Sequence, residues 1–183
     1  SMAGINLNPG SDDRTDEVIV LMTSKKFVYD FVQNRDLYVP LLAFKELNPD
    51  KKTYKVDKNI YDIDKKIWIE GAFNNPSGKP SYEDVYEEFG SLLKITKDFE
   101  TGFISLSFKH RSPFVALQVL DWFIEDVNAN FKSYDIKQSE KALKYLEEKL
   151  IESNLPDIDK AIISLIQEEL SNLMLINIKD QYI

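Results

Sequence analysis

The feature that most constrains the fold is a long stretch without helix-breaking residues. Neither glycine nor proline occurs between Pro113 and Pro156. Ser112-Pro113 is a typical helix start, because a serine hydroxyl can cap the first amides and the fixed φ of proline suits the first turn. A continuous helix from Pro113 to about Leu150 would be about 55 Å long at ~1.5 Å per residue, longer than the core of so short a chain can cover. We therefore expect part of this helix to project.

Apolar residues recur along this helix at the spacing of a helix-helix contact. They form two runs that are out of phase, separated by a polar interval at 137–141. A second helix, expected from about Asp159 to Lys179, has a wide apolar face. Because the first helix outgrows the second, we predict that both contact other copies of the chain, with packing of the two helices on each other as the alternative. The candidate oligomerisation residues are Leu120, Ile124, Val127, Phe131, Tyr134, Leu143, Leu146, Leu150, Ile162 and Ile166.

The residues before Pro113 predict a smaller body of helices and a β-hairpin. Leu92–Lys97 and Phe103–Lys109 alternate apolar and polar residues, and Gly102 suits the left-handed position of a hairpin loop. Ser81, followed by Asp84, is expected to cap a helix that ends near Phe89.

Two further helices are expected closer to the N-terminus. Asp16–Met22 is expected to be short, and Ser24 should cap a helix to about Asn34 that buries Phe27, Val28, Phe31 and Val32 on one face. Residues 45–79 read as a loop with one short helix.

These elements predict an α+β fold in two parts. Residues 1–112 form a small base domain that contains helices and the hairpin at 92–109. Residues 113–183 form the long helix and a return helix, packed on the base and projecting from it.

Composition narrows the class of protein. A chain of 183 residues with 43% hydrophobic residues has material for one cored body. Its net charge of -8 opposes binding to nucleic acid. The absence of cysteine excludes disulfides, thiolate catalysis and cysteine-ligated zinc.

The chain is not expected to cross a membrane by itself. Its longest unbroken apolar runs, Val18–Met22 and Val39–Phe44, are far shorter than the roughly 20 residues that a membrane helix requires. Ser1-Met2 resembles the residue of a cleaved tag and no signal peptide follows, so we expect a piece of a longer protein.

No residues form a convincing catalytic, cofactor or metal site. The acidic cluster Glu83, Asp84, Glu87 and Glu88 could supply the two carboxylates of a glycosidase, but acidic residues in the first turn of a helix are explained by its dipole. His110 is the only histidine and has no partner residues in the sequence pattern. Trp68, Trp122 and the nine tyrosines could stack on sugar rings, although most aromatics are expected in the core.

The order of several short motifs resembles the Wzz chain-length determinant family. The central part is Leu92-Leu93-Lys94-Ile95 through Asp98, then Thr101 to Ser107, Ser112-Pro113 and Ala116. The other matching pieces, in chain order, are Ser24-Lys25-Lys26-Phe27, Lys79-Pro80-Ser81-Tyr82, Val85-Tyr86, Phe89, Asn128, Ser139, Tyr145-Leu146, Leu165-Ile166 and Met174-Leu175 to Tyr182. The chain departs from the family at Ser112, where an aspartate is common, although both residues cap helices.

The resemblance implies a non-enzymatic polysaccharide co-polymerase. Members of the family have an α/β base near the membrane and a long helix, and they form rings of identical protomers. They act with an inner-membrane polymerase in lipopolysaccharide biosynthesis to give O-antigen or a related glycan a preferred length. We therefore expect a periplasmic domain whose partners are further copies of itself and the polymerase, and the resemblance also allows a lipid-linked glycan. Membrane attachment would come from anchors outside this sequence.

Two other functions remain as alternatives. The helices could bind an unrelated protein, as in a structural adaptor. The acidic cluster could instead belong to a glycan-active enzyme. No cofactor is expected for any of the three functions.

Overall fold

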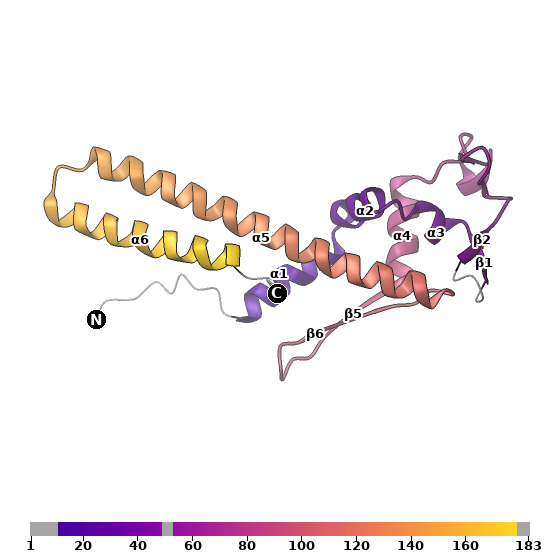
Figure 1. Cartoon of the computed structure of the whole chain (residues 1–183), viewed down its shortest axis with the longest axis horizontal. Coiled ribbons are helices and arrows are strands. Elements are labelled where there is room, and N and C mark those ends of the chain that lie inside the picture. The colour runs from indigo at the N-terminus through magenta and orange to yellow at the C-terminus, as the bar shows by residue number, and fades with distance from the viewer. Residues whose placement is uncertain (1–10, 49–52, 179–183) are drawn as a thin grey trace. The chain divides into compact units, whose positions relative to one another are not determined.

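The computed structural model describes residues 11–48 and 53–178. The helices are α1 (Ser11–Thr23), α2 (Lys25–Asn34), α3 (Tyr38–Leu42), α4 (Tyr82–Leu92), α5 (Pro113–Glu152) and α6 (Pro156–Ile178), with a 3-10 turn at Ala72–Asn74. The strands are β1 (Phe44–Asn48), β2 (Thr53–Val56), β3 (Tyr61–Asp62), β4 (Ile67–Trp68), β5 (Leu93–Lys97) and β6 (Ile104–Phe108). This composition, with a long helix followed by a return helix, confirms the α+β prediction (Figure 1).

Internal contacts divide the chain into two compact units, residues 1–124 and 125–183. The division falls inside α5, twelve residues after the expected boundary at Ser112 (124 − 112). The first three turns of α5 pack within the first unit, because Val115, Val119 and Phe123 are buried. The division by contacts therefore does not coincide with the start of the helix.

The two N-terminal helices form largely as the sequence predicts. Ser24 accepts a hydrogen bond from the Phe27 amide at 3.2 Å and so caps α2. Val28, Phe31 and Val32 of α2 are buried, as expected from their spacing, whereas Phe27 is only half-buried. The expected helix at Asp16–Met22 belongs to the longer α1.

A cluster of phenylalanine rings forms the core of the first unit. Phe31, Phe89 and Phe123 come from α2, α4 and α5, and each is almost completely buried. Their ring centroids are 5.1 to 5.6 Å apart, at angles that range from tilted to edge-on. Phe27 and Phe108 extend the cluster. Edge-on and tilted aromatic pairs add to the stabilisation from buried area, so this cluster ties three helices together.

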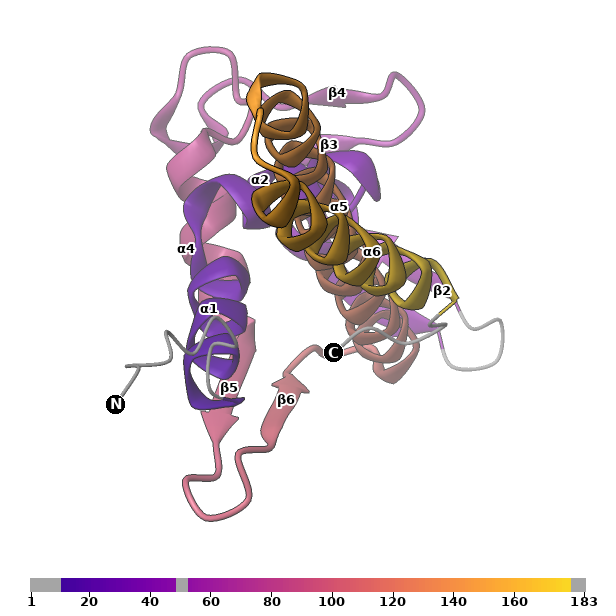
Figure 2. The same ribbon diagram turned by 90° about the vertical axis from the view of Figure 1, so that its left-hand side faces the viewer.

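The hairpin and the helix before it match the prediction closely. β5 pairs with β6 antiparallel, from Leu93 opposite Phe108 to Lys97 opposite Ile104, and Gly102 has a φ of 75° in the loop. Figure 2 shows the hairpin beside α1, and the Lys97 ammonium lies 2.8 Å from the Asp16 carboxylate. Helix α4 begins with the expected cap at Ser81 and continues to Leu92, three residues beyond the predicted end at Phe89.

The prediction of a loop with one short helix between residues 45 and 79 missed two strand pairs, although a short 3-10 helix does occur at Ala72–Asn74. β1 pairs with β2 and β3 pairs with β4, both antiparallel, with a bulge between Phe44 and Glu46 in the first pair. Aromatic contacts stabilise these short strands, because Phe44 packs on Tyr54 and Tyr61 packs on Trp68. The apolar residues are too widely spaced for an obvious period of two, which explains why the sequence pattern was missed.

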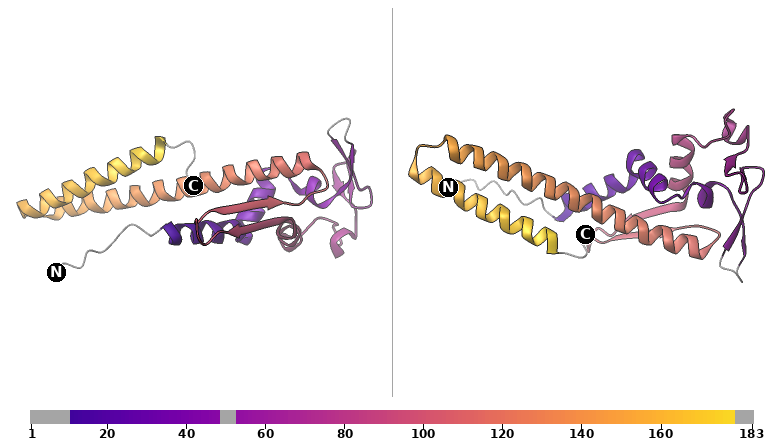
Figure 3. Two further views of the ribbon diagram at one scale, coloured as in Figure 1. Left: turned by 90° about the horizontal axis from the view of Figure 1, so that it is seen from below. Right: turned by 45° about the horizontal axis from the view of Figure 1, so that its top comes forward.

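The second unit is a helical hairpin. Figure 3 shows α6 running back along α5 in both views. α5 is unbroken over 40 residues, which corresponds to about 60 Å at ~1.5 Å per residue. Pro156 opens α6, earlier than the expected start near Asp159, because proline is well suited to the first turn. The expected end at Lys179, and Tyr182 of the family motif, lie outside the described residues.

Candidate functional site

One face of α6 packs in the helical hairpin. Ile162 is buried, and Ile166, Leu173 and Ile176 are half-buried. Their spacing places them on one side of the helix. On α5, Ser139 is buried and the Lys132 ammonium donates a hydrogen bond to the carbonyl of Asn177 at 3.2 Å. Among the described residues of this unit, α5 is the element beside α6, so this face packs on α5.

The ten predicted oligomerisation residues fall into three classes of exposure. Val127, Phe131 and Ile162 are buried within the chain and therefore offer no surface to another copy. Ile124 and Tyr134 are exposed. The half-buried residues are Leu120, Leu143, Leu146, Leu150 and Ile166. The heptad spacing thus identified the packing faces of the two helices more than their free surface.

A second apolar stripe on α6 remains exposed. Ile163, Leu170, Met174 and Ile178 follow one another at spacings of seven, four and four residues, which places them along one side of the helix. Met174 is 63% exposed and Ile178 is 74% exposed. Leu165 and Leu175, elsewhere on the helix, are also exposed. Exposed apolar side chains aligned along one side of a helix often mark a contact site.

The candidate residues therefore need revision. The stripe belongs to the wide apolar face that the sequence predicted for this helix, but only Ile162 and Ile166 of that face were selected as candidates. Both lie on the side that packs in the hairpin. A helix that is apolar over more than half of its circumference has a face left over after packing on one partner, which is the signal that could have identified the stripe.

α5 contributes exposed apolar residues of its own. Leu117 and Ile124 are exposed on the part of α5 in the first unit, and Tyr134 and Tyr145 on the part in the second. Leu117 and Ile124 are seven residues apart and share a face of the helix. These residues give each unit an apolar surface.

The acidic cluster on α4 has structural partners. Ser81 and Asp84 form a reciprocal capping box, in which Asp84 accepts a hydrogen bond from the Ser81 amide at 2.7 Å. Glu83 accepts a hydrogen bond from the Lys25 ammonium at 2.7 Å. These contacts hold α4 in place and explain half of the cluster without catalysis.

His110 links three segments of the first unit. Its Nδ1 accepts a hydrogen bond from the Ser112 amide at 3.0 Å, and its Nε2 donates to the Pro40 carbonyl at 3.1 Å. The ring packs on Phe44 with centroids 4.6 Å apart. Burial lowers the pKa of His110 below its ordinary value of 6.5, and the neighbouring Arg111 guanidinium lowers it further. The neutral ring is therefore a structural connector between the end of β6, α3 and the start of α5.

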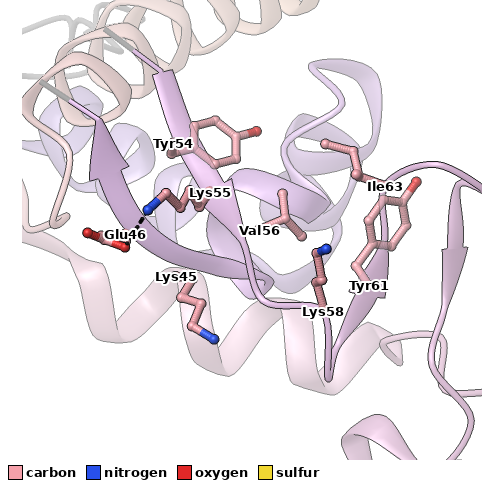
Figure 4. A pocket seen from close by; sticks show the side chains of 8 residues that line it. All are labelled: Lys45, Glu46, Tyr54, Lys55, Val56, Lys58, Tyr61 and Ile63. Atoms are coloured by element: carbon pink, nitrogen blue, oxygen red, sulfur yellow. Dashed lines mark hydrogen bonds and ion pairs between the residues drawn. The ribbon is translucent and has the colours of Figure 1, made fainter. Parts of the chain in front are cut away.

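Two shallow hollows lie in the first unit. The first has a volume of about 440 Å³ and is lined by Lys45, Glu46, Tyr54, Lys55, Val56, Lys58, Tyr61 and Ile63 (Figure 4). The second, of about 410 Å³, is lined by Leu41, Phe44, Glu88, Ser91, Leu92, Lys109, His110 and Arg111. The sequence pattern did not predict that strand pairing would bring Lys45, Lys55 and Lys58 around one hollow.

The remaining candidates do not form a site together. Trp68 packs between Tyr61 and Phe73, whereas Trp122 lies under the Arg35 guanidinium at 5.3 Å. Over residues 11–48 and 53–178, no three His, Cys, Asp or Glu side chains are grouped in a way that could hold a metal ion.

Comparison with known proteins adds no identification. No family model matches the chain, and no curated protein or solved structure has significant similarity to it.

α6 is long and apolar enough to cross a membrane, by length and composition alone. The sequence did not predict this, because Glu168 and Glu169 interrupt its apolar runs. One such helix is weak evidence for a membrane span, since the core helices of soluble proteins can be equally long and apolar. Two adjacent carboxylates near the middle of a span would be costly to bury in lipid.

Proposed function

We propose that this chain is a non-enzymatic assembly module that regulates the length of a surface polysaccharide, like the Wzz proteins that its motifs resemble. The observation that carries the proposal is the exposed stripe Ile163, Leu170, Met174 and Ile178 on α6. Exposed apolar area of this extent is stabilised when another surface covers it. A second copy of the chain is the partner that the resemblance favours.

In this proposal the helical hairpin makes the contacts between copies. A repeated contact between identical chains closes into a ring when the rotation between neighbours allows it. The ring would stand at the periplasmic face of the bacterial inner membrane beside the polymerase, and it would bias how long the glycan grows before release. Neither a cofactor nor a catalytic residue has a part in this function.

The first experiment separates regulation from catalysis. The gene is deleted in its host and the surface glycan is resolved on a gel. Loss of the preferred length with polymer still present is expected for a regulator. An unchanged distribution of glycan lengths, or a total loss of polymer, would contradict the proposal.

The second experiment tests the stripe in the same host. Complementation with Met174→Glu and Ile178→Glu together should fail to restore the preferred length, because two charges would have to be buried in the contact. Ala161→Glu with Asn172→Glu is the matched control, since it adds the same charge to exposed positions on another side of the same helix. Equal restoration by both double variants would exclude the stripe as the contact.

Self-association is measured on the protein itself. Sedimentation of the purified chain over a range of concentrations should show mass increasing with concentration, and less so for the Met174→Glu and Ile178→Glu variant. Anchoring in a membrane raises the effective concentration of the copies, so the same comparison should also be made by crosslinking in cells. Crosslinks to an unrelated protein alone would favour an adaptor.

A further inference from the structure

The hollow in Figure 4 is built from segments that the two strand pairs bring together. Lys45 and Glu46 come from β1, and Tyr54, Lys55 and Val56 from β2. Lys58, Tyr61 and Ile63 enclose the other side, from the turn after β2 to the residue after β3. A volume of about 440 Å³ lies within the range of small-molecule sites. All residues that line the hollow belong to the unit of residues 1–124, whereas the α6 stripe belongs to the other unit.

The charge of this hollow is opposite to that of the chain. Three lysines and one glutamate line it, for a formal charge of +2 (3 − 1), whereas the whole chain carries -8. Lys45 is paired with the Asp57 carboxylate beside the hollow at 3.9 Å, which leaves Lys58 as its main free positive charge among the described residues. Lys55 is held by one exposed ion pair to Glu46 at 3.1 Å, which costs little to exchange for another anion. Lys58 makes no ion pair or hydrogen bond with any residue in the described part of the chain. Its ammonium is available to a ligand.

A guanidinium extends the positive region next to the hollow. Arg111 donates a hydrogen bond to the Lys45 carbonyl at 3.1 Å and lies over the Phe44 ring at 5.6 Å. Arg111 and Lys109 line the neighbouring hollow of about 410 Å³. A cationic surface on an acidic protein attracts anions locally while the rest of the surface repels them.

The lining also offers apolar and hydroxyl surface. Tyr54 and Tyr61 are half-buried, and Val56 and Ile63 lie beside them. Desolvation, and after it the negative charge of Asp36, raise the pKa of Tyr54, so its hydroxyl remains a hydrogen-bond donor at neutral pH. Sugar rings have apolar faces and polar edges, which match aromatic rings combined with hydrogen-bonding groups. Lysines bind phosphate as point charges without demanding a fixed geometry.

We infer that this hollow binds a phosphate-bearing sugar, with Lys58 at the phosphate and the faces of Tyr54 and Tyr61 against the sugar ring. Lys55, which points to Glu46 in Figure 4, joins Lys58 once its exposed ion pair is exchanged for the ligand. The inference goes beyond assembly and does not rest on it, since the lining residues lie outside α6. A phosphate could also belong to a lipid headgroup. The tyrosine rings favour the sugar, because a headgroup alone would need only the lysines.

The experiment is an amide NMR titration of the full chain at constant ionic strength. Addition of glucose 1-phosphate should change the chemical shifts of the amides of residues 53–63 until the site is saturated. Inorganic phosphate and glucose should each bind at least about tenfold more weakly, because each makes only part of the contacts. Vesicles of phosphatidylglycerol are the arm that tests the headgroup. Binding to vesicles without binding to glucose 1-phosphate would overturn the inference, as would equal affinity for inorganic phosphate.

Variants test which side chains carry the binding. Lys55→Gln combined with Lys58→Gln should lower the affinity for glucose 1-phosphate by about tenfold or more, since each lysine makes a charge-assisted contact with the phosphate. Lys94→Gln with Lys144→Gln removes the same charge from exposed positions elsewhere and should change affinity little. Equal weakening by both pairs would mean that only net charge matters, which contradicts a built site.

The ring contact has its own variant. Tyr61 also packs on Trp68, so Tyr61→Leu could loosen the strand pair. Ile63→Ser changes an exposed residue of the same wall and leaves that contact in place. Both variants should lower the affinity for glucose 1-phosphate and leave the affinity for inorganic phosphate unchanged. If Ile63→Ser, in a folded protein, leaves the preference for the sugar phosphate intact, the sugar does not occupy this wall.

Discussion

The two units of this chain use their apolar residues in opposite ways. In residues 1–124, phenylalanines from three helices meet in a cluster whose central rings are almost completely buried. In the helical hairpin of residues 125–178, few side chains are buried and α6 exposes more apolar residues than it buries. The first unit thus has a core of its own, whereas most apolar side chains of α6 in the hairpin are exposed. Stability and assembly are therefore expected to respond to substitutions in different units.

The largest effect should come from the phenylalanine cluster. Phe123→Ala removes the ring that contacts Phe27, Phe31 and Phe89, and should lower the free energy of unfolding by about 3–5 kcal/mol through lost burial and a cavity. Urea denaturation measures the change. Phe99→Ala is the control, because Phe99 is 88% exposed and its loss should change stability by less than about 0.5 kcal/mol. Similar values for the two would mean that the cluster is not the core.

A smaller effect is expected in the hairpin, where the two sides of α6 should differ. Ile162→Ala should destabilise α6 by about 2 kcal/mol, since its side chain is buried at the edge of the hairpin contact. Met174→Ala should cost less than about 0.5 kcal/mol in the dilute monomer, because its side chain is exposed. Hydrogen exchange of the α6 amides reports this local stability. A large loss from Met174→Ala at low concentration would show that the stripe is already covered within one chain.

The capping box of α4 should contribute about 1 kcal/mol. Ser81→Ala removes the hydroxyl that accepts a hydrogen bond from the Asp84 amide at 3.1 Å, which leaves that amide without its cap. Thermal unfolding at neutral pH measures the loss. Ser164→Ala lies on the exposed side of α6, has no capping contact in the described structure, and should have little effect. If Ser81→Ala is as mild as that control, the acidic residues of α4 need another explanation.

The sequence predicts local structure well where one short pattern decides it. Ser24 and Ser81 begin helices because a hydroxyl can accept the first free amides, and Gly102 marks the hairpin because a left-handed φ suits glycine. Ser112-Pro113 identifies the start of the long helix for the same local reason. None of these features depends on distant residues, so the sequence suffices.

Patterns that depend on pairing are harder to predict. The strands between residues 44 and 68 are held by contacts such as Phe44 with Tyr54, which no local period reveals. The basic hollow depends on those strands, so Lys55 and Lys58 could not be brought together from the sequence. The heptad residues Val127, Phe131 and Ile162 were identified as apolar and in contact, but the same spacing describes burial within a chain and contact between chains. Which face remains free depends on the width of the apolar surface.

The smallest predicted effect is a pH dependence that separates the first unit from the hairpin, because the only histidine lies in the first unit. Burial, and then the Arg111 charge, lower the pKa of His110, while hydrogen bonds to Ser112 and Pro40 and the Glu88 charge oppose this shift. The folded protein therefore binds this proton less readily than the unfolded chain.

The neutral ring contributes stability that is fully present above pH 6.5 and is lost as the pH falls from 6.5 towards the lowered pKa. The physical reason is that the half-buried ring loses solvation when it carries a charge, and the nearby Arg111 charge adds to this cost. Urea denaturation from pH 7.5 to 5 should show the native protein losing stability relative to His110→Gln, which does not titrate. The NMR signal of the His110 ring protons should titrate with a midpoint below pH 6.5 in the folded protein. If it titrates above 6.5, or the stability difference is constant with pH, the ring is not held neutral, and its bond to Ser112 does not stabilise the start of α5.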